Sequence, residues 1–428
     1  MSDRRIAIFG LGYVGLPLIR ACLAAGHDVI GFDVSRDVVT RLLSGQSHVD
    51  DVSDAEVKSW QERGFQATSR TRDLVDVDVY VICVPTPLAA DSSPDLGAVI
   101  AATTDIAGHL DLARRPLVIL ESTTYPGTTE EIVKPILETS GGVAGVDFAL
   151  AFSPERIDPG NKVWSFENTP KVVGGLTESC ADQAAAFYST ITSEVVRTKG
   201  LKEAEMAKLL ENTYRHVNIA LVNELAKISD LLGIDIWDVI AAAETKPYGF
   251  QAFRPGPGVG GHCIPIDPNY LGHRVRTELG QSVRFIELAQ EINASMPEYV
   301  VDRVEHLLGS HEVPLAGAEV LLLGVTYKPN IADLRESPSY DVVRGLRARG
   351  ASVVFHDSYV DSWLVDGTEV AKATDLRAAA AHASCTVLLQ SHDEYLQADA
   401  LVDSTLLLDT QGRLRSARGL NGTRWTTM

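Results

Sequence analysis

The sequence predicts an α/β protein with two Rossmann-like, doubly wound domains, joined by a central helical region that contains one long helix. Three observations predict this fold class. A strand, a glycine-rich turn, a helix and a second strand open the chain, an uninterrupted helical pattern begins at Leu201, and a second strand–helix–strand pattern begins at Ala318. We therefore expect an N-terminal domain over residues 1–200, a helical domain over 201–308 and a C-terminal domain over 309–428.

Composition excludes several classes of function. The 428 residues carry a formal net charge of -19, which argues against a nucleic-acid or anionic membrane partner. No apolar run approaches the roughly 20 residues that span a bilayer, and the N-terminus leads into a strand pattern without a signal peptide. The 5 cysteines are far apart and form no CxxC pair. We expect a cytoplasmic, reduced protein without disulfides and without a metal site.

The first strand–helix–strand unit has the features of a dinucleotide-binding motif. An apolar strand, Ile6–Phe9, leads into "GLGYVG", a helix follows to Ala25, and the second strand, Val29–Phe32, ends at Asp33. Glycines let the backbone approach a pyrophosphate at the helix N-terminus, and the acid accepts hydrogen bonds from a ribose diol. Its negative charge favours NAD over NADP. The alternative interpretation of this unit is a tight turn in an α/β domain whose crevice binds no ligand. The expected cofactor-binding residues in this unit are Gly10, Gly12, Tyr13, Val14, Gly15, Asp33 and Arg36.

Polar residues follow the next strands of the N-terminal domain. Thr86, Thr123 and Glu155 each come after an apolar run. In a doubly wound sheet the carboxyl ends of the strands line the ligand crevice, so we expect these side chains near the cofactor or the substrate. Polar residues also simply end strands, which is the alternative for each of them.

The helical pattern from Leu201 to Gly233 contains no proline and no internal glycine. It predicts a helix of over thirty residues, roughly 45 Å long. Lys208 and Asn212 are four apart and share one face with Glu205 and Arg215. A cation and an amide donor so placed can stabilise a developing oxyanion, although a solvated helix face is the usual origin of such a stripe. A helix this long braces two domains or packs against a twin, so we expect a homodimer built on it.

A cysteine stands in an unusual loop, "GPGVGGHCIPIDP", which begins at Gly256. Glycines leave room for a substrate to approach Cys263, and backbone N–H groups favour a thiolate. Asp267 can position the thiol or a nearby lysine. The alternative is a proline-stiffened linker with an incidental cysteine.

Further along, a strand–helix–strand unit ends at Asp357 but lacks GxGxxG, and "CTVLLQSH" and "TLLLDTQG" predict further strands.

A nucleophilic thiol beside a nicotinamide predicts a particular reaction. Oxidation of a primary alcohol gives an aldehyde, which the thiol traps as a thiohemiacetal. This adduct gives up a second hydride and becomes a thioester, which water hydrolyses with a carboxylate base such as Glu155. The expected reaction is a four-electron oxidation of an alcohol to an acid that consumes two NAD.

The chain resembles a known family over essentially its whole length. The motifs "GLGYVGLPL", "VPTP", "ESTTYPGTT", "SPERIDPGN", "KLLENTYRHVNIALVNELA", "GPGVGGHCIPIDP" and "GVTYKPNIADLRESPS" occur in the order found in the nucleotide-sugar 6-dehydrogenases, which include the UDP-glucose and GDP-mannose enzymes. The resemblance implies an N-terminal NAD domain, a central dimerisation region, a C-terminal UDP-binding domain and a UDP-sugar substrate.

The resemblance also implies roles for individual residues. Cys263 is similar to the nucleophile, Lys208 and Asn212 to the oxyanion-stabilising pair, Asp267 to the aspartate that supports proton transfer, and Glu155 to the glutamate linked to thioester hydrolysis. Thr123 resembles the threonine that orders the catalytic water, and Arg335 matches an arginine that reaches the cofactor. The expected substrate-binding residues are Glu155, Arg156, Lys208, Asn212, Arg215, Phe253, Gly256, Gly260 and Lys328; Thr86, Thr123 and Arg335 complete the cofactor site.

One departure concerns the sugar. UDP-glucose enzymes usually carry a second glutamate four residues after the first, and Pro159 stands there in this chain. "SPERIDPGN" and "NTYRHVN" are more similar to the branch that acts on UDP-N-acetylhexosamines, which we favour, with UDP-glucose as the main rival. Two other hypotheses are a two-electron hydroxyacid dehydrogenase, which has no use for Cys263, and a sugar-nucleotide sensor without catalysis. We expect the product to serve biosynthesis of a surface polysaccharide or a glycosylated metabolite.

Overall fold

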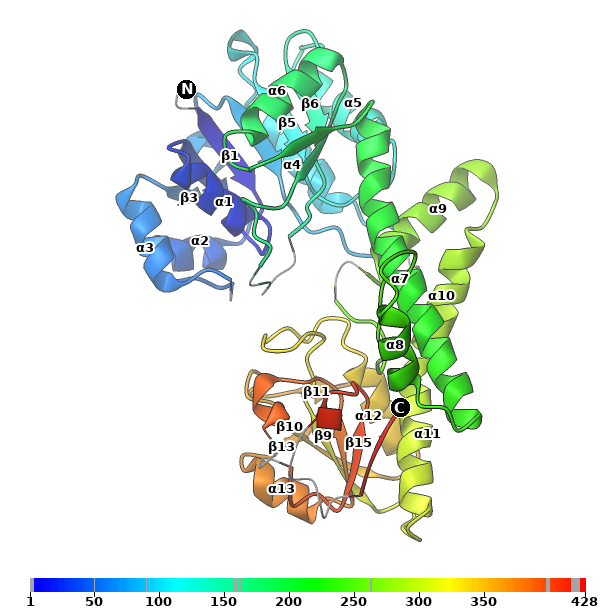
Figure 1. The fold of residues 1–428 in the computed structure, drawn as a ribbon. Coiled ribbons are helices and arrows are strands. Elements are labelled where there is room, and N and C mark those ends of the chain that lie inside the picture. Colours follow the sequence, from blue (N-terminus) through cyan, green and yellow to red (C-terminus); the bar gives the residue numbers. More distant parts are fainter. Residues whose placement is uncertain are drawn as a thin grey trace. The chain divides into compact units, whose positions relative to one another are not determined.

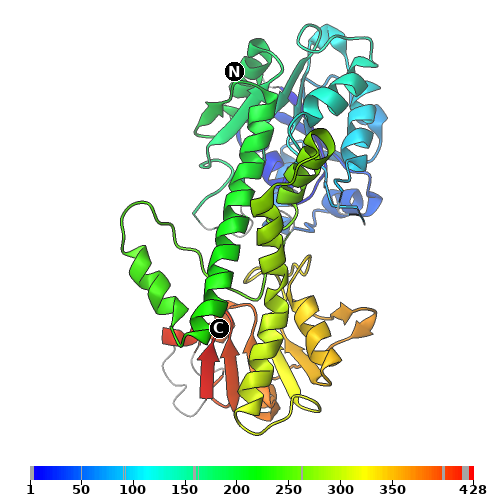
Figure 2. The same cartoon turned by 90° about the vertical axis from the view of Figure 1, so that its right-hand side faces the viewer.

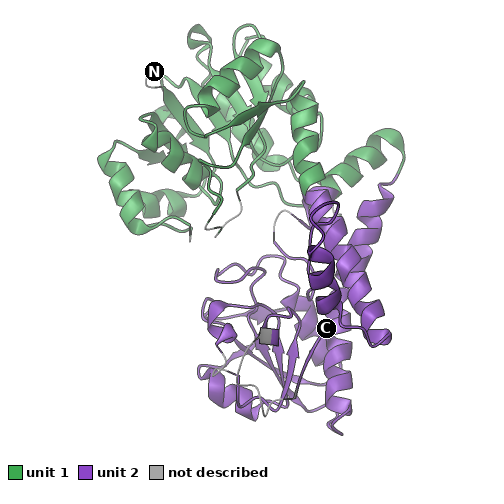
Figure 3. Ribbon diagram, viewed as in Figure 1, with its two compact units in different colours: residues 1–211, 269–281 green, residues 212–268, 282–428 purple. Residues whose placement is uncertain are grey.

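The computed structural model describes residues 4–49, 51–89, 91, 93–157, 161, 163–261, 264–397, 401–416 and 424–428. The chain divides into two compact units, shown in different colours in Figure 3. Unit 1 comprises residues 1–211 and 269–281, and unit 2 comprises residues 212–268 and 282–428. The boundary between them falls inside one long helix, α7 (Leu201–Leu231).

Unit 1 is built on a sheet whose described strands follow the order β3-β2-β1-β4-β5-β6-β7-β8 (Figure 1). Neighbouring strands are parallel, apart from the antiparallel pair β6 and β7. The first six strands have the order of a doubly wound nucleotide-binding sheet. The strands are β1 (Arg5–Phe9), β2 (Asp28–Phe32), β3 (Gln66–Thr68), β4 (Val79–Ile82), β5 (Leu117–Leu120), β6 (Ala149–Phe152), β7 (Lys171–Gly175) and β8 (Val195–Arg197).

Helices cover both faces of this sheet because its strands are apolar on both sides. Alternate residues of β1 lie in different buried clusters: Ile6 and Ile8 pack with side chains of α1, α2, α3 and α6, and Ala7 and Phe9 pack with side chains of α4, α5 and the start of α7. The helices are α1 (Gly15–Ala24), α2 (Arg36–Leu43), α3 (Asp54–Glu62), α4 (Gly97–Ala107), α5 (Lys134–Glu138) and α6 (Glu178–Tyr188), with short helical segments at Thr71–Asp73, Leu112–Arg114 and Thr129–Val133. Helix α9 (Asp267–Leu279) also belongs to unit 1, apart from its first two residues, which belong to unit 2.

Unit 2 contains a second parallel sheet, in the order β13-β10-β9-β14-β15-β16 over its described residues. Val320 and Leu322 of β9 pack against α11 and α12, whereas Leu321 and Leu323 face α13 and the short helix at Asp393–Leu396. Its strands are β9 (Glu319–Leu323), β10 (Ser352–His356), β13 (Ala371–Lys372), β14 (Cys385–Leu388), β15 (Leu406–Asp409) and β16 (Arg424–Thr427), beside the hairpin β11 (Leu364–Val365) and β12 (Thr368–Glu369). Its helices, besides most of α7, are α8 (Ile236–Glu244), α10 (Arg284–Ala294), α11 (Met296–Gly309), α12 (Ser339–Ala348) and α13 (Leu376–His382), with a short helix at Leu414–Ser416.

The long helix confirms the helical pattern read from the sequence. In unit 2 it runs alongside α10 and α11, as Figure 2 shows. Buried amides join these helices, since Asn223 Nδ2 donates to Asn293 Oδ1 over 2.9 Å. Lys227 Nζ donates to Ser295 Oγ over 2.5 Å. Two parallel sheets and a helical region with one long helix are therefore the observed fold, as the sequence predicts.

The structure also shows the state of the described cysteines and the character of the described helices. The described cysteines, Cys22, Cys83, Cys180 and Cys385, are free and buried. Among the helices of the described residues, none combines the length and the hydropathy needed to cross a membrane.

Candidate active site

The turn after β1 contains glycines of two kinds: those that are crowded by protein atoms and one that is not. A Cβ on Gly10, whose φ is +93°, would lie 2.6 Å from the Cys83 carbonyl oxygen, and a Cβ on Gly15 would lie 1.9 Å from the Gly10 oxygen. The fold itself therefore requires these two glycines. A Cβ on Gly12 would meet no atom within 4 Å. Gly12 borders open space, where a ligand can approach the backbone.

The N-terminus of α1 is suited to an anion. Its N-cap residue is Val14, and no side chain caps the helix. Leu16 N–H donates to the Gly12 carbonyl oxygen over 3.1 Å and Pro17 has no N–H, so an anion at this end would interact with Gly15 N–H and with the positive end of the helix dipole. Val14 and Tyr13 pack, partly buried, against the core of unit 1, which fixes the turn. These features fit the pyrophosphate of a dinucleotide.

Asp33 follows β2 and holds the turn from the other side. Its two carboxylate oxygens accept the backbone N–H groups of Leu11, over 2.9 Å, and Ser35, over 2.8 Å. The side chain is only partly buried, and an ionised carboxylate has lone pairs for further donors such as ribose hydroxyls. Arg36, the first residue of α2, is exposed. The residues present thus fit NAD.

We predict that Gly12→Ala and Gly10→Ala differ in effect. Gly12→Ala should leave the melting temperature unchanged and weaken NAD binding about tenfold or more, because the added methyl group occupies the ligand's side of the turn. Gly10→Ala should also lower stability by about 2 kcal/mol or more, since alanine is strained at this φ and contacts Cys83. Thermal unfolding and NAD titration of both variants measure this. Equal melting temperatures for the two variants would contradict the assignment.

The remaining predicted cofactor residues follow other strands of unit 1. Thr86 comes four residues after β4, and its carbonyl oxygen accepts the hydroxyl of Tyr270 of α9 over 3.0 Å. Thr123 comes three residues after β5 and is partly buried. Both lie beyond the carboxyl ends of parallel strands, where the sequence predicts them.

Glu155 follows β6 and is almost fully buried. One carboxylate oxygen accepts the N–H of Ile157, and the other lies 3.7 Å from Lys171 Nζ. Its backbone oxygen accepts Lys208 Nζ of α7 over 2.6 Å, and Lys208 is itself buried. The structure thus brings together two residues that the sequence proposes for the chemistry. Arg156 faces elsewhere: it bonds Glu211 and the backbone of Pro170.

Sequence reasoning missed three buried polar residues beside Glu155. Lys171 Nζ lies 3.1 Å from the carboxylate of Glu121, and the hydroxyl of Tyr188 donates to the same carboxylate. A charged residue at the start of the apolar strand "KVVGG" was the available signal, because lysine is almost never fully buried unless it is paired.

Glu205, on the same face of α7 as Lys208, anchors the loop after Thr123. Its carboxylate accepts the N–H groups of Gly127 and Thr129, over 2.6 and 2.9 Å, and the Thr129 hydroxyl over 2.7 Å. Burial raises the pKa of Glu205 to about 7, although these hydrogen bonds oppose the rise.

This shift predicts a loss of stability with rising pH. The folded state retains a proton on Glu205 at pH values where the unfolded chain, with a pKa near 4.5, has lost it. The contribution is complete below the unfolded pKa and is lost as the pH rises through 7, by about 3 kcal/mol. We therefore expect the free energy of unfolding of Glu205→Gln, relative to that of the wild type, to increase between pH 4.5 and pH 8 when both are measured by chemical denaturation. Glu203→Gln, at an exposed position two residues before Glu205 in α7, should not; a constant difference for both variants would contradict this.

Two further predicted residues meet within unit 2. Asn212 Nδ2 donates to the carboxylate of Asp267, the first residue of α9, and both side chains are buried. Arg215 is exposed on α7. Phe253 packs partly buried, with its ring edge-on to Tyr214 at 5.7 Å. Cys263 lies outside the described residues.

The glycine-rich loop is approached closely by another segment of unit 2. A Cβ on Gly260 would lie 2.7 Å from the Glu336 carbonyl oxygen, and one on Gly261 would lie 2.8 Å from the Tyr327 ring. The N–H of Gly256 donates to Asn223 Oδ1 over 3.0 Å. At Gly260 and Gly261 the room that glycine leaves is therefore used by protein atoms, where the sequence led us to expect a substrate.

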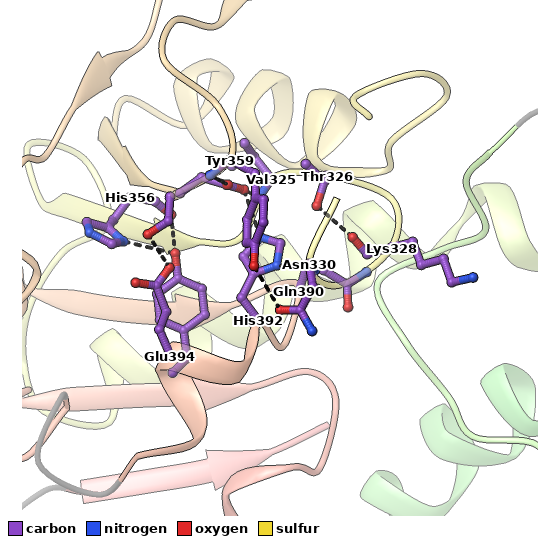
Figure 4. A network of polar contacts seen from close by, with 12 residues as sticks. Val325, Thr326, Lys328, Asn330, His356, Tyr359, Gln390, His392 and Glu394 are labelled. Carbon is purple, nitrogen blue, oxygen red and sulfur yellow. Dashed lines mark hydrogen bonds and ion pairs between the residues drawn. The ribbon is translucent and has the colours of Figure 1, made fainter. Parts of the chain in front are cut away.

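The segment that approaches this loop carries Lys328 and Arg335. Arg335 pairs with Asp333 through two hydrogen-bonding nitrogens. Figure 4 shows the Lys328 side chain extending away from a buried network that holds its loop. In that network His392 Nδ1 accepts the N–H of Asn330 over 2.8 Å, and His392 Nε2 donates to Asp357 over 3.0 Å.

Asp357 in unit 2 repeats the arrangement of Asp33 in unit 1. It accepts the N–H groups of Val325 and Tyr359, each over 2.8 Å, as Asp33 accepts those of two loop residues. Burial alone would raise the pKa of Asp357, but the His392 and backbone hydrogen bonds hold it below its ordinary value. Asp357 is fully buried, however. It supports its loop and has no exposed oxygen for a ribose.

Comparisons with known proteins assign all three parts of the chain to the same family. Models of the UDP-glucose/GDP-mannose dehydrogenase family match residues 4–192 as the NAD binding domain, 202–295 as the central domain and 321–416 as the UDP binding domain. The chain is 39% identical to Protein CapL from Staphylococcus aureus, over 84% of this chain and 83% of that one. It is 38% identical to a UDP-N-acetyl-D-glucosamine 6-dehydrogenase from Pseudomonas aeruginosa, over 85% and 84%. The solved UDP-D-ManNAc dehydrogenase from Pyrococcus horikoshii has a TM-score of 0.88 at 30% identity and covers 99% of this chain, which in turn covers 98% of it.

Proposed function

The chain belongs to the UDP-glucose/GDP-mannose dehydrogenase family and is an NAD-dependent UDP-sugar 6-dehydrogenase, and from this premise we propose that it oxidises the C6 alcohol of a UDP-N-acetylhexosamine to the acid. The observation that carries the choice of sugar is the similarity to enzymes named for UDP-N-acetylglucosamine and UDP-N-acetylmannosamine over most of the chain. UDP-glucose remains the rival substrate.

The N-terminal residues would bind the cofactor. Bound NAD supplies the hydride acceptor in both oxidations. The uncapped first turn of α1 binds its pyrophosphate, Gly12 lets the backbone approach, and Asp33 accepts hydrogen bonds from the ribose hydroxyls. Thr86 and Thr123 complete the cofactor site, with Arg335 from the C-terminal segment.

Cys263 would hold the substrate between the two oxidations. Its thiolate adds to the C6 aldehyde and forms a C–S bond, and the resulting thiohemiacetal oxyanion gives up a second hydride and becomes a thioester. Lys208 and Asn212 stabilise the negative charge that develops on the C6 oxygen. Asp267 supports Asn212, in keeping with their buried hydrogen bond.

Glu155 would act as the base in hydrolysis. It takes a proton from the attacking water as the C–O bond forms and passes it to sulfur as the C–S bond breaks. The acid product loses its remaining proton to solvent, and the cysteine is free for the next turnover. Thr123 orders the water, and Lys328 binds the sugar nucleotide.

A substrate panel tests this proposal. UDP-GlcNAc, UDP-ManNAc, UDP-glucose, UDP-galactose and GDP-mannose are each followed by NADH absorbance, with the product measured by mass spectrometry. We expect the highest kcat/KM on an N-acetylhexosamine and two NADH per acid formed, as a four-electron oxidation requires. A single NADH per substrate would support a two-electron dehydrogenase instead, and highest activity on UDP-glucose would favour the rival sugar.

An exposed apolar stripe on α7 supports a homodimer. The stripe consists of Tyr214, Leu221, Leu225 and Ile228 of α7 and of Leu232 directly after the helix, at spacings of three, four and seven residues. Leu221 is 50% exposed and Leu225 is 41% exposed. Apolar side chains in a contiguous row on a helix are typical of a protein–protein interface.

We predict that the double variant Leu221→Glu/Leu225→Glu is a folded monomer. Charged side chains in a dimer interface lose solvation without gaining partners. Light scattering coupled to size exclusion at micromolar concentration should give twice the chain mass for the wild type and one chain mass for the variant. Val146→Glu, an exposed apolar position in unit 1, is the control and should keep the wild-type mass. A monomeric wild type would overturn the dimer.

A further inference from the structure

Glu155 shares a dry cluster with a second carboxylate and one ammonium group. Lys171 Nζ lies 3.1 Å from Glu121 Oε2 and 3.7 Å from Glu155 Oε2. The side chains of Lys171, Glu121 and Glu155 are 5%, 0% and 11% exposed. Three consecutive strand regions supply them: β7 begins at Lys171, Glu121 follows β5, and Glu155 follows β6.

From this geometry we propose that Lys171 is a positioning residue for hydrolysis. Its ammonium group keeps the Glu155 carboxylate charged and correctly oriented, and Glu121 holds Lys171 in place. The inference rests on the proposed function, in which Glu155 is the base. It assigns a role to two residues that the mechanism above does not use.

The neighbours of Lys171 keep it in one position. Its ammonium group lies 5.1 Å from the ring centroids of both Phe166 and Tyr188. The hydroxyl of Tyr188 and the thiol of Cys83 both face the Glu121 carboxylate. These two contacts and the ion pair with Lys171 hold the Glu121 carboxylate in place.

Charge balance explains why an ammonium group is needed there. Burial alone would lower the pKa of Lys171, but Glu121 and Glu155 raise it above its ordinary value. Burial raises the pKa of Glu121, and Lys171 opposes that rise. Two carboxylates in a dry site without a cation would tend to take up a proton.

The other groups that face Glu155 do not replace this cation at its carboxylate. Lys208 Nζ contacts the backbone oxygen of Glu155, and Ile157 N–H contacts the opposite carboxylate oxygen, Oε1. Cys83 and Tyr188 reach Glu121. A protonated Glu155 cannot accept the proton of the attacking water. Both hydride transfers of the first turnover would therefore still occur, and the thioester would then accumulate.

The test compares four variants: Lys171→Met, Glu121→Gln, Lys171→Met/Glu121→Gln and Glu155→Gln. For Lys171→Met we expect a normal first-turnover burst of NADH, a steady-state kcat reduced about tenfold or more, and an acidic limb of the kcat–pH profile that moves to higher pH. Glu121→Gln removes the carboxylate that holds Lys171, so we expect a normal burst and a smaller reduction of the steady-state kcat than in Lys171→Met. Its acidic limb should stay at the wild-type pH, because the Lys171 charge remains beside Glu155. A shifted acidic limb is a result that a merely structural role of Lys171 would not produce.

The double variant separates charge balance from position. It has the same total charge in the cluster as the wild type, so it keeps the test valid if Lys171→Met alone fails to fold. We expect it to retain the slow hydrolysis and the shifted profile, and wild-type turnover in it would overturn the proposal. Glu155→Gln tests the proposed function separately: if it turns over normally, Glu155 is not the base, whereas a slow Glu155→Gln beside a normal Lys171→Met removes only the role of Lys171.

Discussion

Cys263→Ser is expected to reduce turnover on the order of a thousandfold or more while both substrates still bind. Serine keeps the shape of the side chain but is a much weaker nucleophile without an adjacent base, so the aldehyde is not trapped. Rates of NADH formation, with titrations of NAD and the UDP-sugar, measure the two effects separately. The product balance should also change, with free aldehyde in place of acid.

Two controls sharpen this result. Cys263→Ala should bind both substrates like the serine variant and also fail to form acid, because neither has a thiolate. Cys180→Ser, at a buried cysteine in α6, should keep the wild-type ratio of acid to NADH. Wild-type turnover in Cys263→Ser would end the covalent mechanism.

Lys208→Ala is expected to lower kcat by about 2–4 kcal/mol in activation free energy, the range for loss of an oxyanion donor. The structure adds a second reason, because Lys208 Nζ donates to the backbone oxygen of Glu155 over 2.6 Å. Removing it weakens both the proposed charge stabilisation and the placement of the base. Steady-state kinetics should therefore show a loss in kcat that exceeds the change in KM.

Lys202 provides a matched control on the same helix. It is 53% exposed and pairs with Glu130 and Glu131 on the surface. Such pairs contribute little, so Lys202→Ala should be close to wild type in kcat. Equal kcat values for Lys208→Ala and the wild type would remove Lys208 from the chemistry.

The fold could be predicted because its signals are local in the sequence. The strand–turn–helix pattern after Ile6, the absence of glycine and proline from α7, and the apolar strands near residue 320 each act over a few residues. Periodicity and turn chemistry therefore predicted the two parallel sheets and the long helix.

The packing around the candidate site could not be predicted in this way. Lys171 and Glu155 are sixteen residues apart, and Glu121 is thirty-four residues before Glu155. Only the alignment of β5, β6 and β7 in one sheet brings them together. Likewise Tyr327, distant in sequence, fills the space beside Gly261. A residue pattern shows which side chains are suited to chemistry, whereas their partners depend on tertiary structure.

The two aspartates that follow the second strand of each unit show what can and what cannot be predicted from the sequence. The sequence placed an acid, Asp33 or Asp357, at the end of each second strand. It could not show that His392 and burial commit Asp357 to its own loop, while Asp33 stays partly exposed. Equivalent positions in two similar folds therefore take different roles because their neighbours differ.

The most direct measurement of the covalent mechanism is peptide mass spectrometry after acid quench. Glu155→Gln is incubated with NAD and UDP-N-acetylglucosamine, quenched during NADH formation, and digested. We predict that the peptide containing Cys263 carries the mass of the oxidised sugar nucleotide, because the thioester forms and hydrolyses slowly. Formation of NADH with an unmodified Cys263 peptide, or with the adduct on another residue, would contradict the proposed role of this thiol.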